Sequence, residues 1–566
     1  MKKLLLVSLS IILIGMIIFS GCGEKSTTTT TGPAPSTTQP TVKPPTTTSV
    51  PGSTTSTVKP TSTTPAPGQP VSGGTLRMVS GAIPKNLGYG PEKAPSDAFY
   101  MLPVLEHLCE WGPSGGTLVP VLATSWESDH ASNTITWHLR QGVKFTDGTA
   151  FNAEAVRWNV QLAIDNRSGT GTNLIESLEV KDDLTLIMHM ISFDWQTVQN
   201  LGLTQCISPT SYLTAGGSIS SGSDNEKSKD WARGHAVGTG PFTVGDWVRD
   251  DHMTFVKNPN YWQPGKPYLD KIIMTMITDP MVASASIQAG EADIWNDTSS
   301  VNDINTLQQL GFKINWGPGM FNVLLMTTNN PDNPLSNIKV REAVEYALDR
   351  PTMAKTLGQG LYEPFTQMAS KTWPGYVPGY DPRPFNTARA KELLAEAGYP
   401  QGLKMKVFAA SMGNISDVMS LFIHYLGLAG IEVEPDIADL GRYFGTLFGG
   451  GAGWEDLCIS ASGINPDASD LFVHFGPNPM TFRTTNMLKT EAFVQLCNEA
   501  ISTQYDSAAS AMPKIQAAIK QAGEDCLFIP LWRSAEAAIM QPYVHTEYPK
   551  IHGIIWSPAD DWMEKH

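Results

Sequence analysis

The sequence predicts an α/β fold with more than one domain-sized unit, and three observations lead to that expectation. From Gly238 to Trp295 the chain reads as a run of strands closed by one helix. From Lys404 to Ile437 two expected strands flank a helix, an order that suits an α/β unit. About 500 residues follow the N-terminal leader and linker, enough for roughly three domain-sized units.

Residues 1–22 read as a lipoprotein signal peptide. Lys2 and Lys3 form a positive end, Leu4 to Phe19 an apolar run, and the Phe-Ser-Gly-Cys sequence that ends at Cys22 resembles a lipobox. An uncleaved anchor is the alternative, but the run is shorter than the roughly 20 residues that a spanning helix needs. We therefore expect a diacylglycerol on Cys22, since two acyl chains bind a membrane stably where one is marginal.

Residues 23–70 consist almost entirely of Thr, Pro, Ser and Gly. Such a segment cannot bury enough apolar surface to offset its ordering entropy, so it is expected to be a disordered linker. At about 3.1 Å per residue it could extend well over about 100 Å and let a tethered domain find a membrane partner. Its threonines also permit O-linked sugars.

Charge and cysteine content exclude several classes of site. The formal net charge of -15 argues against a nucleic-acid surface, which needs a basic face. Apart from Cys22, five cysteines lie far apart with no Cys-x-x-Cys pair, so neither a zinc nor a redox site is expected. We expect them to be buried small hydrophobes, with at least one free thiol: Cys109, Cys206, Cys458, Cys497 and Cys526.

The first elements after the linker are a strand, a loop and a helix. Gly74 to Ser80 alternates as a strand, and residues 86–96 form a loop rich in Gly, Pro and Tyr. Ala98 to Leu108 has apolar residues at helical spacing, which predicts a helix. Further on, Ile135, Trp137 and Leu139 alternate as a half-buried strand, and Asn152 is a good N-cap for a helix that carries Val156 and Val160.

The central block opens with Gly238-Thr239-Gly240-Pro241-Phe242, a tight corner that leads into a strand. Met253 to Val256 and Lys271 to Ile277 are expected strands. A helix from Pro280 to Gly290 follows, and Ala292 to Trp295 returns as a strand. The helix is expected to bury one stripe, formed by Val282, Ala285, Ser286 and Ala289.

Two amphipathic helices and a short strand follow in the C-terminal half. The first helix carries a stripe of Val340, Ala343, Val344, Ala347 and Leu348. The second is capped by Asn386, with Leu393, Leu394 and Ala397 inward. Leu457 to Ala461 is a short apolar strand. The glycines from Gly449 to Gly453 do not fit G-x-G-x-x-G, because Trp454 holds the last glycine's place, so a flexible loop is expected there.

Several motifs occur in an order and spacing shared with one known family. They read GTGPF, KNPNYW, GKPYLDKI and SIQAGEADI, and they are supported by GVKFTDGTAFNAEAVRWN before them and FNTARAKELLAEAGYP after them. This order resembles the extracytoplasmic solute-binding proteins of family 5, the peptide and nickel binders of ABC importers.

The resemblance implies a two-lobe, periplasmic-binding-protein-like α/β fold of class II with a hinge between the lobes. Lobe I would comprise residues 71–115, 237–325 and 528–566. An inserted subdomain would comprise residues 116–236, and lobe II residues 326–527. The chain would then cross between the lobes twice.

The same resemblance implies a function in import. The protein is expected to be a monomer, lipid-anchored to the outer face of the cell membrane, that captures an oligopeptide-like solute and delivers it to permease and ATPase subunits. No cofactor or metal is expected. An oligosaccharide, chelated nickel, or a ligand sensed for a receptor are the alternatives. An enzyme is not expected, because H-E-x-x-H, G-x-S-x-G and the P-loop motif are absent.

Aromatic side chains in loops at candidate lobe edges are expected to wall the binding cleft: Trp111, Tyr362, Trp373 and Trp454. In peptide-binding relatives, an aspartate after the strand that resembles Leu457 to Ala461 pairs with the α-ammonium of the peptide. Ser462 holds that place here and cannot form the ion pair, although Asp467 or Asp470 could substitute.

Neutral and positive groups complete the expected site. Ser462 and Asn465 would offer neutral hydrogen-bonding groups, and Lys93 a positive charge from the loop of the first lobe. Together they favour a neutral or acidic solute, whereas a solvated Lys93 would have no role.

Overall fold

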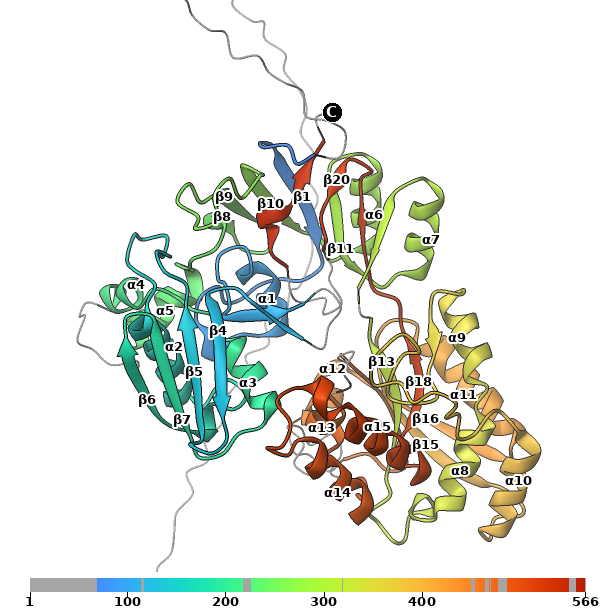
Figure 1. Ribbon diagram of the computed structural model, residues 1–566. Helices are drawn as coiled ribbons and strands as arrows, with labels where there is room; N and C mark the ends of the chain where they lie inside the picture. Colours follow the sequence, from blue (N-terminus) through green and yellow to red (C-terminus); the bar gives the residue numbers. More distant parts are fainter. Residues whose placement is uncertain are drawn as a thin grey trace, which may run out of the picture. The chain divides into compact units, whose positions relative to one another are not determined.

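A computed structural model describes residues 69–112, 117–216, 225–317, 319–448, 453–463, 468, 470–476, 486–548 and 556–564. Figure 1 shows these residues in the colours of the sequence. The leader, Cys22 and the linker up to residue 68 lie outside the described residues. Among the described segments, no helix combines the length and the apolarity that crossing a membrane requires.

A seven-stranded sheet has the order β12-β19-β11-β1-β10-β9-β8. Figure 1 labels β8, β9, β10, β1 and β11 of this sheet. β1 runs parallel to both β10 and β11, with Leu76 and Met78 buried, so the expected strands of the central block are confirmed. We call the part built on this sheet lobe I. Its strands are β1 (Thr75–Ser80), β8 (Phe242–Val248), β9 (His252–Lys257), β10 (Lys271–Met276), β11 (Ile294–Thr298), β12 (Lys313–Trp316) and β19 (Ala537–Met540).

A six-stranded sheet has the order β14-β18-β13-β17-β15-β16, and we call the part built on it lobe II. Both faces are buried: Phe321, Val323 and Leu325 join one apolar cluster, whereas Leu324 and Met326 join another. Its strands are β13 (Phe321–Met326), β14 (Glu363–Pro364), β15 (Leu403–Ala410), β16 (Ile431–Ala438), β17 (Leu457–Ser462) and β18 (Ile529–Arg533).

The division of the chain into lobes stays a prediction, and strand pairing bears on two of its boundaries. The expected boundary between residues 325 and 326 falls inside β13, and β18, expected in lobe I, pairs with β13 in lobe II. The pairing favours one crossing before β13 and another after β18.

Helices cover both faces of the six-stranded sheet. The expected stripe of the first amphipathic helix is buried, from Val340 to Leu348, and the Asn386 side chain accepts from the Arg389 N–H at 3.0 Å, so both predictions are confirmed. On one side lie α8 (Ile338–Ala347), α9 (Arg350–Gly358), α10 (Thr387–Glu396) and α11 (Ile415–Leu428); on the other, α12 (Leu440–Phe448), α13 (Asp470–Phe475), α14 (Glu491–Ala500) and α15 (Ala508–Glu524).

A four-stranded antiparallel sheet, β4-β5-β7-β6, forms the inserted subdomain. The expected alternation is confirmed, because Ile135, Trp137 and Leu139 are all buried, and Asn152 caps the following helix through the Ala155 N–H at 3.0 Å. Its elements are β4 (Ala123–Asp129), β5 (Thr134–Leu139), α2 (Ala153–Asp165), β6 (Ile175–Asp182), β7 (Thr185–Met190), α3 (Trp195–Gly202), α4 (Pro209–Ala215) and α5 (Glu226–Gly234).

Two helix predictions were wrong in detail. The helix expected over Ala98 to Leu108 is instead α1 (Pro95–Met101); Pro103, which lacks an N–H, follows its end. In α6 (Pro280–Gln288), Val282 is 52% exposed and the buried residues are Ala283, Ser284 and Ile287. The larger Ile287 packs with Trp295 and Ile304, so it sets the buried face.

All five described cysteines are buried and free of disulfides, as the interpretation of small buried hydrophobes expects. Among the described residues, no group of three or more His, Cys, Asp or Glu side chains could hold a metal ion.

Candidate functional site

The carboxyl ends of parallel strands lie at the candidate site. β1, β10 and β11 end at Ser80, Met276 and Thr298 in lobe I. In lobe II, β15 runs parallel to β16 and β17 and ends at Ala410. In α/β sheets, ligands bind in the crevice outside these ends.

A cavity of about 750 Å³ is lined from both sets of strand ends, a size typical of small-molecule sites. Lobe I contributes the residues that follow its strands together with the start of α7 (Val301–Gln309). Lobe II contributes the end of α9 and the loop that leads into α11. Representative lining residues are Gly81, Ile277, Thr278, Thr298 and Asn302 from lobe I, and Gln359, Tyr362, Gly413, Asn414 and Asp417 from lobe II.

Neutral polar groups dominate this cavity. The Gln359 amide donates to Asn302 Oδ1 at 2.8 Å and accepts from Asn305 Nδ2 at 3.2 Å, which joins α9 of lobe II to α7 of lobe I. Asp417 is the single charged side chain among the described lining residues. It is exposed in the first turn of α11, where the helix dipole favours a carboxylate.

Of the expected site residues, Tyr362 lines this cavity, whereas Ser462 and Trp373 do not. Ser462 lies in a row of paired residues of lobe II. Ser462 pairs with Phe321, Phe321 with Arg533, and Arg533 with Glu363. Directly opposed residues of antiparallel strands share a face. The row therefore crosses four strands at one end of the sheet.

Arg533 is the main group in this row that sequence reasoning missed. Its guanidinium contacts Glu363 at 3.1 Å and lies 5.5 Å from the centre of the Trp373 ring. A lone cation directly after the apolar run from Leu527 to Trp532 was the available signal. Its partner Glu363 lies 170 residues earlier, on a two-residue strand that no periodicity reveals.

The remaining expected site residues lie elsewhere or outside the described residues. Trp111 is buried on β2 (Cys109–Trp111) and pairs with Leu118 of β3 (Leu118–Pro120). Trp454 is buried and lines a separate polar cavity of lobe II. Asn465 and Asp467 lie outside the described residues.

Lys93 is exposed and donates to Gln205 Oε1 at 3.1 Å. It does not line the cavity between the strand ends. Burial and the charge of Lys93 together lower the pKa of His107 to about 3, so this imidazole is uncharged. Solute contacts by Lys93, Trp111 and Trp454 stay predictions.

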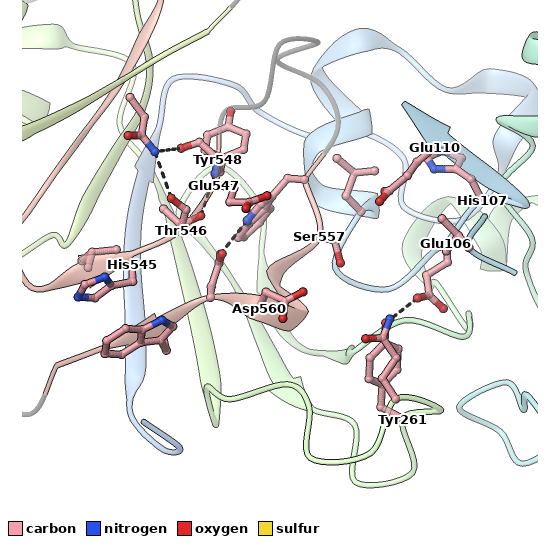
Figure 2. Close-up of a pocket in the computed structure, with 18 of the residues that line it drawn as sticks. Glu106, His107, Glu110, Tyr261, His545, Thr546, Glu547, Tyr548, Ser557 and Asp560 are labelled. Carbon is pink, nitrogen blue, oxygen red and sulfur yellow. Dashed lines mark hydrogen bonds between the residues drawn. The ribbon is translucent and has the colours of Figure 1, made fainter. Parts of the chain in front are cut away.

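A second cavity, of about 570 Å³, lies within lobe I and has a carboxyl-rich wall. Figure 2 shows Glu106 beside Tyr261 on one wall and the residues from His545 to Tyr548 on the other. Its acidic side chains have partners: Asp561 accepts from Trp556 Nε1 at 2.8 Å, and Asp560 pairs with Lys266.

Glu106 accepts hydrogen bonds from two sequence motifs of the central block. Its buried carboxyl accepts from Thr239 Oγ1 at 2.7 Å, from the Tyr261 hydroxyl at 2.7 Å and from Trp262 Nε1 at 2.9 Å. Burial raises the pKa of Glu106 to about 7, although these three donors oppose the shift. Residues of the GTGPF and KNPNYW motifs therefore hydrogen-bond to the same buried carboxyl group of lobe I.

Two α/β lobes with a cavity lined from the strand ends of both define a two-lobed solute-binding protein. The chain belongs to the bacterial extracellular solute-binding proteins, family 5, whose middle-region pattern matches residues 117–460. Glutathione-binding proteins are among its relatives. The one from Shigella flexneri is 29% identical over 329 residues, and the one from Escherichia coli K12 is 28% identical. Each match covers 57% of this chain and 61% of the relative's length.

Solved structures share the fold over most of the chain. The Helicobacter pylori binding protein DppA in complex with the peptide STSA has a TM-score of 0.70 and 22% identity, covering 88% of this chain and 99% of that one. NikA from Brucella suis in complex with Fe(III)-EDTA has a TM-score of 0.72 and 22% identity, covering 85% of this chain and 98% of that one. At these identities the likeness shows the fold alone.

Proposed function

We propose that the protein is the binding component of an ABC importer, and that it captures an oligopeptide-like solute and hands it to the permease as the lobes close. The observation that carries the proposal is the cavity lined from the strand ends of both lobes. A solute there contacts both lobes at once, so its binding favours the closed arrangement. Chemistry on the solute is not part of this function.

The cavity lining supports a short peptide as the solute class. Amide and hydroxyl groups can pair with peptide N–H and C=O groups, and Trp295 and Tyr362 supply aromatic surface. Peptide ligands are named for relatives and fold neighbours, among them glutathione and STSA. Ser462, which holds the place of an aspartate in peptide-binding relatives, offers no charge to an α-ammonium, so peptides with blocked amino ends are also expected to bind.

The N-terminal segment supplies the tether in this proposal. Residues 1–22 direct export, Cys22 carries the lipid, and residues 23–70 form the linker. Mass spectrometry of the N-terminal peptide should find a diacylglycerol on Cys22, and Cys22→Ala should release the protein into the medium. An unmodified Cys22 would refute the proposed tether but would not bear on the proposed binding of the solute.

Calorimetry with a panel of short peptides, including glutathione and N-acetylated versions, tests the proposed function. We expect saturable one-to-one binding. Asp417→Asn should weaken the binding of basic peptides about 5-fold, because it removes an exposed ion pair worth about 1 kcal/mol. Neutral peptides should be unaffected by this change.

Glu432→Gln is the matched control, because Glu432 is an exposed carboxylate at the amino end of β16, away from the carboxyl ends. It should leave all affinities unchanged. Absence of binding across the panel would refute the peptide proposal, and equal effects of the two substitutions would refute the placement of the site.

A further inference from the structure

One tryptophan of the inserted subdomain lies inside lobe II. Trp195, the first residue of α3, is 1% exposed, and its indole Nε1 donates to the Ala500 carbonyl oxygen at 3.0 Å. Ala500 is the last residue of α14 in lobe II, 305 positions further along the chain. The hydrogen bond is itself buried.

The acceptor is suited to such a contact. The last four carbonyl groups of an α-helix have no partner within the helix, and Ala500 belongs to that set. An N–H from another subdomain therefore satisfies a buried carbonyl group. The negative end of the α14 dipole also favours a donor at this point.

The donor is held in place by its own helix and by apolar packing. Asp194 caps α3 by accepting from the Thr197 N–H at 2.8 Å, which fixes the first turn that carries Trp195. The indole belongs to the apolar cluster of lobe II that includes Phe493 and Cys497. Among the described residues of 117–237, it is the single buried member of that cluster.

In the lobe closure of the proposed function, lobe II moves relative to the inserted subdomain, so opening of the cleft would break this contact. The indole ring and the Ala500 carbonyl would then both be exposed to water. This site is separate from the solute cavity, since neither Trp195 nor Ala500 lines it.

We propose that Trp195 is a closure latch, which seats on the C-terminal end of α14 and sets the balance between open and closed forms. The latch rests on the lobe closure of the proposed function. It acts without touching the solute, so it shifts the population of closed protein rather than the chemistry of recognition.

Distances between two spin labels, measured without solute, test the latch. The labels are placed through Ser177→Cys on β6 and Asn498→Cys on α14, both exposed positions, while the five native cysteines of the described chain are buried. The parent protein should show a short, closed distance. Trp195→Phe keeps a ring but loses the donor, and the closed fraction relative to the open one should fall about 5-fold, as loss of one hydrogen bond predicts.

Trp195→Ala should shift the distances further toward the open form. Trp126→Ala, which removes a partly buried indole of the same subdomain, is the control and should leave the distances unchanged. An unchanged distribution in Trp195→Phe, or a parent protein with no closed distance, would overturn the latch. If Trp195→Ala does not fold, the distance distribution of Trp195→Phe alone tests the latch. Because no solute is added, failure of peptide binding and failure of the latch remain distinguishable.

Discussion

At the scale of single residues, Glu106 shows how a carboxyl group can serve structure within a binding protein. Its three donors come from two separate motifs, at Thr239 and at Tyr261 and Trp262, and the group is removed from water. Removal from water favours the neutral acid, so the pKa of Glu106 lies at about 7.

This pKa predicts a specific dependence of stability on pH. The folded pKa of about 7 lies above the ordinary 4.5, so the native state holds a proton that the unfolded state releases. The resulting stabilisation is present in full below pH 4.5 and is lost as the pH rises to about 7, an effect on the order of 3 kcal/mol.

Glu106→Gln should remove this component, because a neutral amide does not titrate. Urea denaturation at several pH values between 4.5 and 8 gives the free energy of unfolding at each pH. The contribution of Glu106 is the difference between parent and variant in the slope of this free energy against pH. Glu432→Gln, which changes an exposed carboxylate that does not line this cavity, should keep the parent dependence on pH. A variant at Glu106 with the same slope as the parent protein would contradict the assignment.

At the scale of elements, the corner at Gly238 depends on close backbone contact. A Cβ at Gly238 would overlap the carbonyl oxygen of Val104, which is backbone and cannot move aside easily. Gly238→Ala should therefore destabilise the protein by about 3 kcal/mol. Gly234→Ala is the matched control, because a Cβ there meets nothing within 4 Å, and it should change stability by less than about 0.5 kcal/mol. Thermal denaturation measures both, and equal effects would show that the corner tolerates a side chain.

The sequence predicted helices and strands well where one face of the element is buried. It predicted them poorly where distant strands or helices that pack on the element determine its position. Ile135, Trp137 and Leu139 alternate with polar residues, so the buried face of β5 was evident. β13 and β18 are apolar on both faces, and their sheet is set by pairing over more than 200 residues, which no local pattern records. In α6, the expected stripe through Val282 is wrong, because the face that carries Ile287 packs against the apolar cluster of lobe I.

The candidate site was predictable only in part for the same reason. Tyr362, Trp373 and Ser462 were expected from aromatic loops and from the resemblance to family 5; Tyr362 lines the cavity, and solute contacts by all three stay predictions. The partnership of Arg533 with Glu363 and the amide contacts between Gln359 and α7 join distant segments, so only the folded chain reveals them.

At the scale of the whole molecule, parallel strands end on both sides of one cavity, and the Gln359 amide and the Trp195 indole each join parts of the chain that belong to different sheets. A solute held between these parts would be enclosed by binding. The proposed function therefore follows from the arrangement of strand ends rather than from any single side chain.

Native mass spectrometry of the purified protein, incubated with a mixture of short peptides, tests this central claim most directly. We predict a one-to-one complex with a peptide whose mass is unchanged when it is released. Protein that stays free of peptide, or a peptide recovered as cleaved or modified product, would contradict the account.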